Sequence, residues 1–288
     1  MTDFLHALMD PEIPFFRYAM VACALASVAF GTVGTFVVAR RISYIAGAVA
    51  HSVLGGVGVA LYLQRRFGLD WLDPFYGAVV AALLSALIIG LVSLHARQRE
   101  DTVIGAIWAV GMAVGLLCIS AAPGQFDPMA YLFGDVLMIS RTDLILIAVL
   151  DLVVIGVAFF RLAELQAVCF DEEFARARGL PVERLYLLLL CLTALTVVLM
   201  VSIVGIVMVV ALLTLPAAAA GGLTRRLGHM IGLAVFFCFV FSTLGMGISY
   251  MANLPTGPTI IMIAAAAYLA IATTRAVIGT RSGTKHEE

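Results

Sequence analysis

The chain contains 288 residues, of which 63% are hydrophobic and only 12% are charged, and its formal net charge is −1. So few charged groups could not cover the surface of an ordinary water-soluble domain, and the mean hydropathy of +1.10 indicates a polytopic membrane protein. Long apolar runs without sustained alternation favour membrane-spanning helices over barrel strands. Nothing in the composition indicates a nucleic-acid partner, and we expect none.

The apolar segments predict a single transmembrane domain over residues 1–288, with an outer segment at 1–12 and a tail at 280–288. A helical crossing requires about 20 apolar residues, which allows eight or nine crossings. The nine predicted spans cover residues 13–38, 42–63, 75–96, 102–121, 143–162, 184–204, 206–222, 231–252 and 258–279.

The basic residues indicate how the chain is oriented. With nine crossings and the amino terminus outside, thirteen basic residues fall on the inner side and four on the outer side. This is the imbalance expected from the positive-inside rule, so we expect an outer N-terminus and a cytoplasmic C-terminus. A cleavable signal peptide starts with basic residues, whereas this chain starts with the acidic residues Asp3, Asp10 and Glu12. The first span is therefore expected to stay in the mature chain.

The second predicted span carries an ionisable residue at membrane depth. Gly47, His51 and Gly55 recur every four residues, a spacing of small residues that lets another helix approach closely. An ionisable group inside a membrane is costly and is usually kept for a function. His51 is therefore a candidate transient metal ligand on a translocation path. The alternative is a histidine that only packs and donates a hydrogen bond to a carbonyl on a neighbouring helix.

Later elements add further candidates. Residues 129–139 are too short to span and are expected to lie in the interface or re-enter the membrane. Asp151 lies eight residues into the fifth span and could either face a cavity and line the pathway or pair with a partner group. The inner segment 170–179 begins with acids and ends with arginines and Gly179, which is typical of a short helix.

Residues 185–223 form one apolar stretch of 39 residues. As a single helix this stretch would be about 58 Å long, nearly twice the hydrocarbon thickness. We expect a break near 202–216, with Ser202 and Gly205 at the first interruption and Pro216 at a second. Such a break would be a candidate wall of the pathway. Two straight helices joined by a tight outer turn are the alternative.

The chain contains no motif for ATP binding. Its only lysine is Lys285, in the tail, and no GxxxxGK[ST] sequence is present. We therefore expect a transport subunit that is not itself an enzyme, with no permanently bound cofactor, and ATP bound and hydrolysed by a partner chain. The five cysteines form no CxxC pair, so neither a disulfide framework nor a thiolate metal site is expected.

An ordered set of motifs covers nearly the whole chain. These are residues 40–51 (RRISYIAGAVAH), Asp127 with 131–134 (YLFG), 170–175 (FDEEFA) with 179–180 (GL), 210–218 (VALLTLPAA), 224–226 (TRR) and 254–258 (LPTGP). Together they resemble the membrane permease subunits of the bacterial ABC importers for zinc, manganese and iron, the ABC-3 family.

The resemblance implies an all-α permease of the type II importer architecture in the bacterial cytoplasmic membrane. It also implies three kinds of partner: a second copy of the chain, two cytoplasmic ATP-binding subunits, and an extracytoplasmic metal-binding protein that delivers the ion. The ion would enter the cytoplasm by alternating access.

The same resemblance assigns roles to individual residues. His51 matches a histidine near the translocation path, whereas the aspartate that family members often carry four positions earlier is Gly47 here. The inner segment 217–230 resembles the element that docks in the ATPase, and the 171–179 loop is a second possible contact. The exposed docking residues would be Thr224, Arg225, Arg226 and Gly228, together with Asp171, Arg176 and Gly179.

Two other functions remain open from the residues alone. A secondary transporter could use His51 and Asp151 as a proton relay, and it would be expected to contain inverted repeats, which are not evident. A membrane scaffold or assembly factor would carry no solute at all.

Overall fold

The structure is a computed structural model that describes residues 14–69, 71–95, 100–123, 134, 139–224 and 226–283. Over these residues the chain is helical, and nine of its helices are long and apolar enough to cross a membrane, which confirms the predicted fold class. The helices are α2 (Pro14–Ala39), α3 (Ser43–Phe67), α4 (Pro74–His95), α5 (Glu100–Ala121), α7 (Arg141–Phe170), the short α8 (Glu172–Ala177), α9 (Val182–Val204), α10 (Ile206–Leu223), α11 (Leu227–Ala252) and α12 (Thr256–Gly283).

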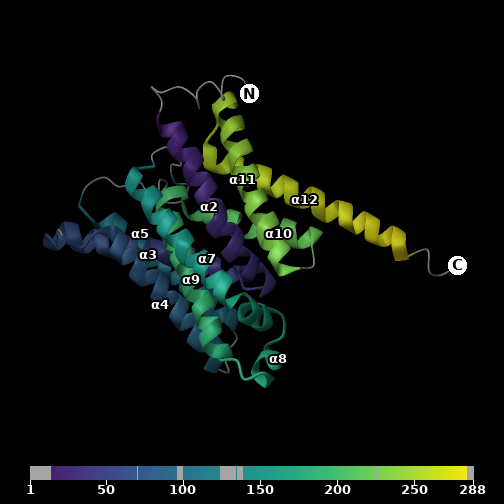
Figure 1. The fold of residues 1–288 in the computed structure, drawn as a ribbon. Coiled ribbons are helices and arrows are strands. Elements are labelled where there is room, and N and C mark those ends of the chain that lie inside the picture. Colours follow the sequence, from purple (N-terminus) through teal and green to yellow (C-terminus); the bar gives the residue numbers. More distant parts are fainter. Residues whose placement is uncertain are drawn as a thin grey trace.

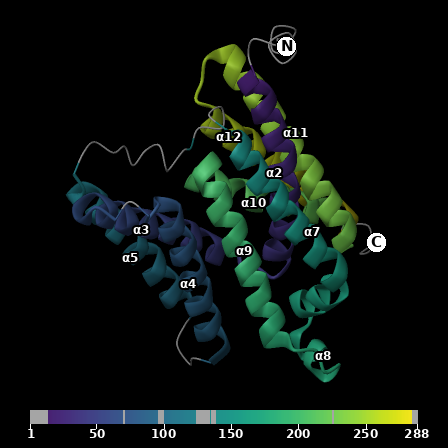
Figure 2. The same cartoon turned by 60° about the vertical axis from the view of Figure 1, so that its left-hand side comes forward.

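The spanning helices pack in two groups (Figure 2). In the first group, α3 packs against both α4 and α5. In the second, α2 packs against α7, α10 and α11, and α12 covers α10 and α11. Helix α9 contacts α4 and α3 on one side and α7 on the other, so it joins the two groups. The short α8 lies at one extremity of the bundle in both views (Figure 1), and we call this extremity the α8 end.

Glycines allow the helices of the first group to approach closely. A Cβ atom placed on Gly56 of α3 would overlap the backbone carbonyl oxygen of Gly77 on α4, and a Cβ on Gly77 would overlap that of Gly56. On the other side of α3, a Cβ on Gly55 would lie 2.7 Å from the carbonyl oxygen of Gly111 on α5. The close helix approach predicted from the small-residue spacing is therefore found on both sides of α3.

The long apolar stretch breaks at a single residue. Helix α9 ends at Val204 and α10 begins at Ile206, with Gly205 between them at φ 80° and ψ 160°. Glycine adopts this positive φ without a Cβ penalty, which confirms the predicted break at Gly205. Gly134, also at positive φ, lies against this junction, because a Cβ there would overlap the Val204 backbone.

The second interruption, predicted at Pro216, is wrong. Pro216 lies inside α10, which continues to Leu223. A proline removes one N–H donor from the helix, but tight packing of neighbouring helices tolerates this loss in membrane spans. Pro216 is itself buried, as are its neighbours Ala217 and Leu213, so the surrounding helices hold α10 continuous.

The element boundaries otherwise agree with the predicted spans to within a few residues, except that α7 continues to Phe170 instead of ending near residue 162. The predicted outer segment 1–12 lies outside the described residues, as does most of the predicted short segment 129–139.

Candidate functional site

The imidazole of His51 is held on α3 with one nitrogen free. His51 is half-buried, and its Nδ1 lies 2.9 Å from the carbonyl oxygen of Gly47, one helical turn earlier. A carbonyl oxygen only accepts hydrogen bonds, so Nδ1 carries the hydrogen and donates it. In the neutral ring, Nε2 then keeps its lone pair and is the nitrogen available to a metal ion.

An indole ring from α5 covers this imidazole. Trp108 stacks on His51 with the ring centroids 4.3 Å apart and an angle of 25° between the planes. The same indole lies 5.6 Å from the ring centroid of Tyr44, so Trp108 sits between Tyr44 and His51. It also lies over Gly47, where an added Cβ would be 2.7 Å from its Cζ3 atom. The indole of Trp108 therefore occupies the space over Gly47, between the side chains of Tyr44 and His51.

Asp151 is buried elsewhere in the bundle. It lies on α7, which packs against α2, and only 5% of its surface is exposed. Neither of its carboxylate oxygens has a hydrogen-bond partner among the described residues, so it makes no hydrogen bond to His51. Over the same residues, no three His, Cys, Asp or Glu side chains gather as a metal site would need. The structure therefore does not join the two candidate intramembrane groups into one site.

The remaining pathway candidates lie at the α9–α10 junction. Gly205 is buried in this junction, whereas the side chain of Ser202 lies outside the described part of α9. Helices α9 and α10 both pack against α3, the helix that carries His51. The two helices that meet at this junction therefore both lie beside the helix that carries His51.

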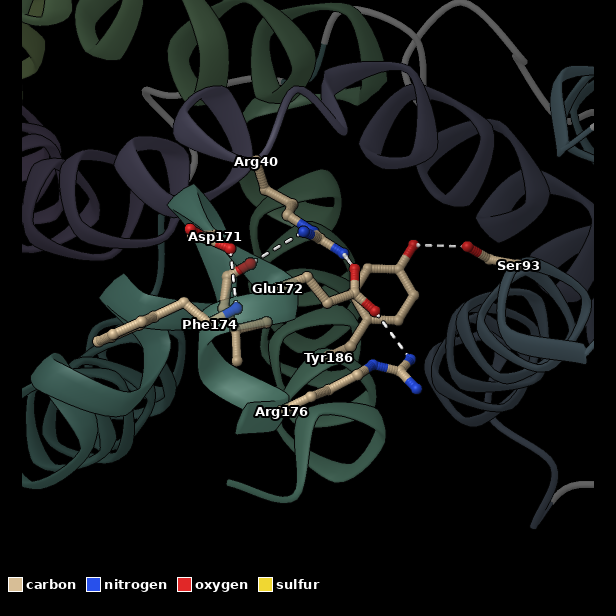
Figure 3. Close-up of polar contacts among 8 residues, drawn as sticks. Arg40, Ser93, Asp171, Glu172, Phe174, Arg176 and Tyr186 are labelled. Atoms are coloured by element: carbon tan, nitrogen blue, oxygen red, sulfur yellow. Dashed lines mark hydrogen bonds and ion pairs between the residues drawn. The ribbon is translucent and has the colours of Figure 1, made fainter. Parts of the chain in front are cut away.

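A polar cluster occupies the α8 end, and we call its four members Arg40, Glu172, Arg176 and Tyr186 the Arg40 cluster (Figure 3). Arg40 donates from Nη2 to Glu172 Oε2 at 2.6 Å, and Arg176 donates to Glu172 Oε1 at 2.9 Å. The Arg40 guanidinium also lies 5.4 Å from the ring centroid of Tyr186 on α9.

Two further hydrogen bonds extend the Arg40 cluster to other helices. Arg40 Nη1 donates to the carbonyl oxygen of Val168 on α7 at 2.9 Å, and the Tyr186 hydroxyl donates to Ser93 Oγ on α4 at 3.3 Å. Through Arg40, which directly follows α2, the contacts of this cluster thus connect α8 to the spanning helices α4, α7 and α9 (Figure 3).

Helix α8 has the form predicted for the 170–179 segment. The carboxylate of Asp171 caps its first turn by accepting from the backbone N–H of Phe174 at 2.9 Å. Gly179, at φ 75°, follows the helix and reverses the chain direction. Asp171, Arg176 and Gly179 are all exposed. The helix therefore presents a polar surface at the α8 end.

The Arg40 cluster predicts a specific pH dependence of stability. The hydrogen bond from Arg40 lowers the pKa of the Glu172 carboxyl. A pKa that is lower in the folded state stabilises the fold above the ordinary carboxyl value of about 4.3, and this contribution is lost as the pH falls through the lowered value. In the wild type, the thermal unfolding midpoint should fall as the pH drops below about 4.3, and in Glu172→Gln this fall should be smaller. At neutral pH the substitution should lower the free energy of unfolding by at most about 1 kcal/mol.

Glu173→Gln is the matched control for this measurement. Glu173 is the adjacent acid on α8, is exposed, and makes no ion pair within the described residues. Its replacement should leave the fall of the unfolding midpoint at acid pH unchanged. If both substitutions changed that fall equally, the Arg40 contact would have no role in it.

The second predicted docking segment lies between α10 and α11. Ala217, Ala219 and Ala220 are fully buried within α10, so the exposed part of the 217–230 segment starts at Leu223. Thr224 follows α10, and the exposed residues Arg226 and Gly228 stand at the start of α11. Arg225 lies outside the described residues.

Sequence reasoning missed Trp108, Tyr44 and the Arg40–Glu172 pair. The glycine at position 47 indicated that another helix comes close, but it did not identify the side chain that fills the space. Arg40 and Glu172 are 132 residues apart in the sequence, and no local pattern connects them.

The whole-chain comparisons agree with this architecture. The model of the ABC 3 transport family matches residues 12–275. The chain therefore belongs to the ABC 3 transport family.

Individual relatives match over most of their length. A probable metal transport system membrane protein of Chlamydia trachomatis is 36% identical over 256 residues, which cover 88% of this chain and 87% of the relative. The manganese transport system membrane protein MntC of Listeria monocytogenes is 32% identical, over 91% of this chain and 90% of the relative. Among solved structures, PsaBC from Streptococcus pneumoniae, in complex with Fab, matches with a TM-score of 0.81 and 31% identity over 94% of each chain.

Proposed function

We propose that this chain is the membrane-spanning permease subunit of an ABC importer that moves a divalent metal ion, zinc, manganese or iron, into the cytoplasm. Family membership and the metal-transport names of two relatives support this function. The observation that carries it is the His51 imidazole, whose Nδ1 is occupied by a hydrogen bond to Gly47 while Nε2 keeps its lone pair inside the bundle. One such nitrogen binds an ion weakly enough to release it, as a conduction path requires.

The permease would work with three kinds of partner and in one orientation in the membrane. Two copies of the chain would form the path, separate ATPase subunits would supply the energy, and an extracytoplasmic protein would deliver the ion. With the N-terminus outside the inner membrane, the α8 end faces the cytoplasm. The exposed surface of α8, the exposed residues Arg226 and Gly228 and the neighbouring Thr224 would then contact the ATPases, and alternating access would move the ion.

The test is uptake of radioactive zinc, manganese or iron into vesicles that contain the permease, its ATPase and its binding protein. We expect accumulation that requires ATP and persists when a protonophore removes the proton gradient. Accumulation that continues without ATP and collapses with the protonophore would overturn the proposal.

One observation favours a second candidate function. The unpartnered, buried carboxyl group of Asp151 is costly in its charged form and is the kind of group that proton-coupled transporters use. A secondary transporter that relays protons through His51 and Asp151 would give the reverse outcome in the same uptake experiment. The absence of a hydrogen bond between the two groups, within the described chain, favours the ATP-driven function.

A further inference from the structure

The side chain that occupies the space above Gly47 determines which donor atoms can lie beside His51. This side chain is the indole of Trp108, whose Cζ3 and Cη2 atoms would lie 2.7 Å and 3.0 Å from a Cβ at position 47. Real Cβ atoms do not approach a ring carbon this closely, so no side chain at position 47 can coexist with Trp108 in this position. The face of α3 that carries His51 therefore offers the imidazole nitrogen and, at position 47, an indole ring in place of a carboxylate.

The indole also fixes the orientation of the imidazole. Stacking at 4.3 Å restrains the ring plane, and the hydrogen bond from Nδ1 to Gly47 restrains its rotation about the side chain. Among the described residues, the imidazole has no carboxylate as a hydrogen-bond partner. A rigid nitrogen donor without a neighbouring carboxylate is a ligand set that Zn²⁺ accepts readily, whereas Mn²⁺ prefers oxygen donors.

We propose that Trp108 is a specificity-determining residue. It excludes a carboxylate from position 47 and holds the imidazole of His51 in place. The site therefore prefers ions that bind imidazole, such as Zn²⁺, over Mn²⁺. This inference deepens the proposed function and rests on it, because it assigns an ion class to the same pathway. Trp108 itself donates no ligand to the ion.

The first test uses the fluorescence of Trp108 in the purified full-length chain. The sequence contains two tryptophans, and Trp71 is 72% exposed, so Trp71→Phe leaves Trp108 as the only tryptophan, whose indole is excited selectively beyond the absorption of tyrosine. Co²⁺, an ion that accepts imidazole and quenches indole at short range, should quench Trp108 saturably. His51→Ala in the same background should abolish the saturable part, and Zn²⁺ should displace Co²⁺ at a concentration at least about tenfold lower than Mn²⁺.

Either of two results would overturn the inference. Quenching that persists after His51→Ala would show that Trp108 does not report on an ion at the imidazole. Displacement of Co²⁺ by Mn²⁺ at the same concentration as by Zn²⁺ would show that the indole ring gives no preference.

A second test changes the residues at positions 47 and 108 and measures bound zinc and manganese by elemental analysis after equilibrium dialysis. Trp108→Ala makes room at position 47, and two double variants then differ only in their donor atoms. Gly47→Asp with Trp108→Ala should lower the ratio of bound zinc to manganese by roughly tenfold, because it adds a carboxylate. Gly47→Ala with Trp108→Ala adds a Cβ without a donor, so its ratio should fall below that of the wild type, because the indole no longer holds the imidazole, but should stay above that of the aspartate variant. Equal ratios in the two double variants would overturn the inference.

The binding measurements require neither ATP nor a partner subunit, so they separate this inference from the proposed function. Zinc preference in the isolated chain without ATP-driven uptake in the assembled complex would overturn the proposed function alone. ATP-driven uptake by a chain that shows no preference between the two ions would overturn the specificity inference alone.

Discussion

Replacing His51 with alanine should reduce ATP-driven metal uptake by at least about tenfold, the range that perturbing a metal site usually costs. The structure gives the reason: Nε2 of this imidazole is the one ring nitrogen that is not engaged by the Gly47 carbonyl. The measurement is the initial rate of uptake in vesicles that contain the assembled transporter. Assembly with the ATPase, followed by size-exclusion chromatography, should be unaffected.

His51→Gln controls for packing in this experiment. The alanine variant also removes a ring that stacks on Trp108, a contact worth roughly 0.5–1.5 kcal/mol. Glutamine keeps more of the side-chain volume and can still donate to the Gly47 carbonyl, but it lacks the imidazole nitrogen. Both variants should lose uptake equally even where their thermal stabilities differ. Uptake within twofold of the wild-type rate in both variants would remove His51 from the pathway.

Gly56→Ala should destabilise the fold by roughly 1–3 kcal/mol or more, because it places a Cβ against the Gly77 backbone. A flexible side chain could move aside, but here the opposing atoms belong to the main chain of α4. The substitution must therefore separate α3 from α4. The measurement is the thermal unfolding midpoint of the purified chain in detergent, together with the fraction that remains monodisperse.

Gly156→Ala is the matched control, since it makes the same chemical change within a spanning helix. A Cβ at Gly156 on α7 would meet nothing within 4 Å among the described atoms. Because alanine is a better helix former than glycine, this variant should be as stable as the wild type or more stable by up to about 1 kcal/mol. Equal losses in the two variants would mean that the α3–α4 contact does not limit stability.

The spans were predictable because apolar length alone fixes where a chain can cross hydrocarbon. The break at Gly205 was predictable for a related reason, since 39 apolar residues exceed one crossing and glycine accepts the required φ. Pro216 was misinterpreted because the cost of a missing N–H depends on the surrounding helices, which a sequence does not show.

The candidate site was predictable only in part. His51 was identifiable because an imidazole at membrane depth is unusual in any context. Its partner Trp108 is an apolar residue in an apolar helix, and it comes into contact only through the way α5 packs on α3. Arg40 and Glu172 were equally hidden, because charges near helix ends are expected from membrane orientation alone.

The position of Arg40 has a mechanical consequence. Three residues after Arg40, α3 begins at Ser43, and it then runs as one uninterrupted rod for eight more residues to His51, roughly 12 Å further on. Glu172 binds the guanidinium of Arg40 in the turn that leads into α3, where Arg41 has a positive φ of 61°, and His51 lies on α3 itself. A tilt of α8 would therefore displace the turn that leads into α3, and α3 carries His51.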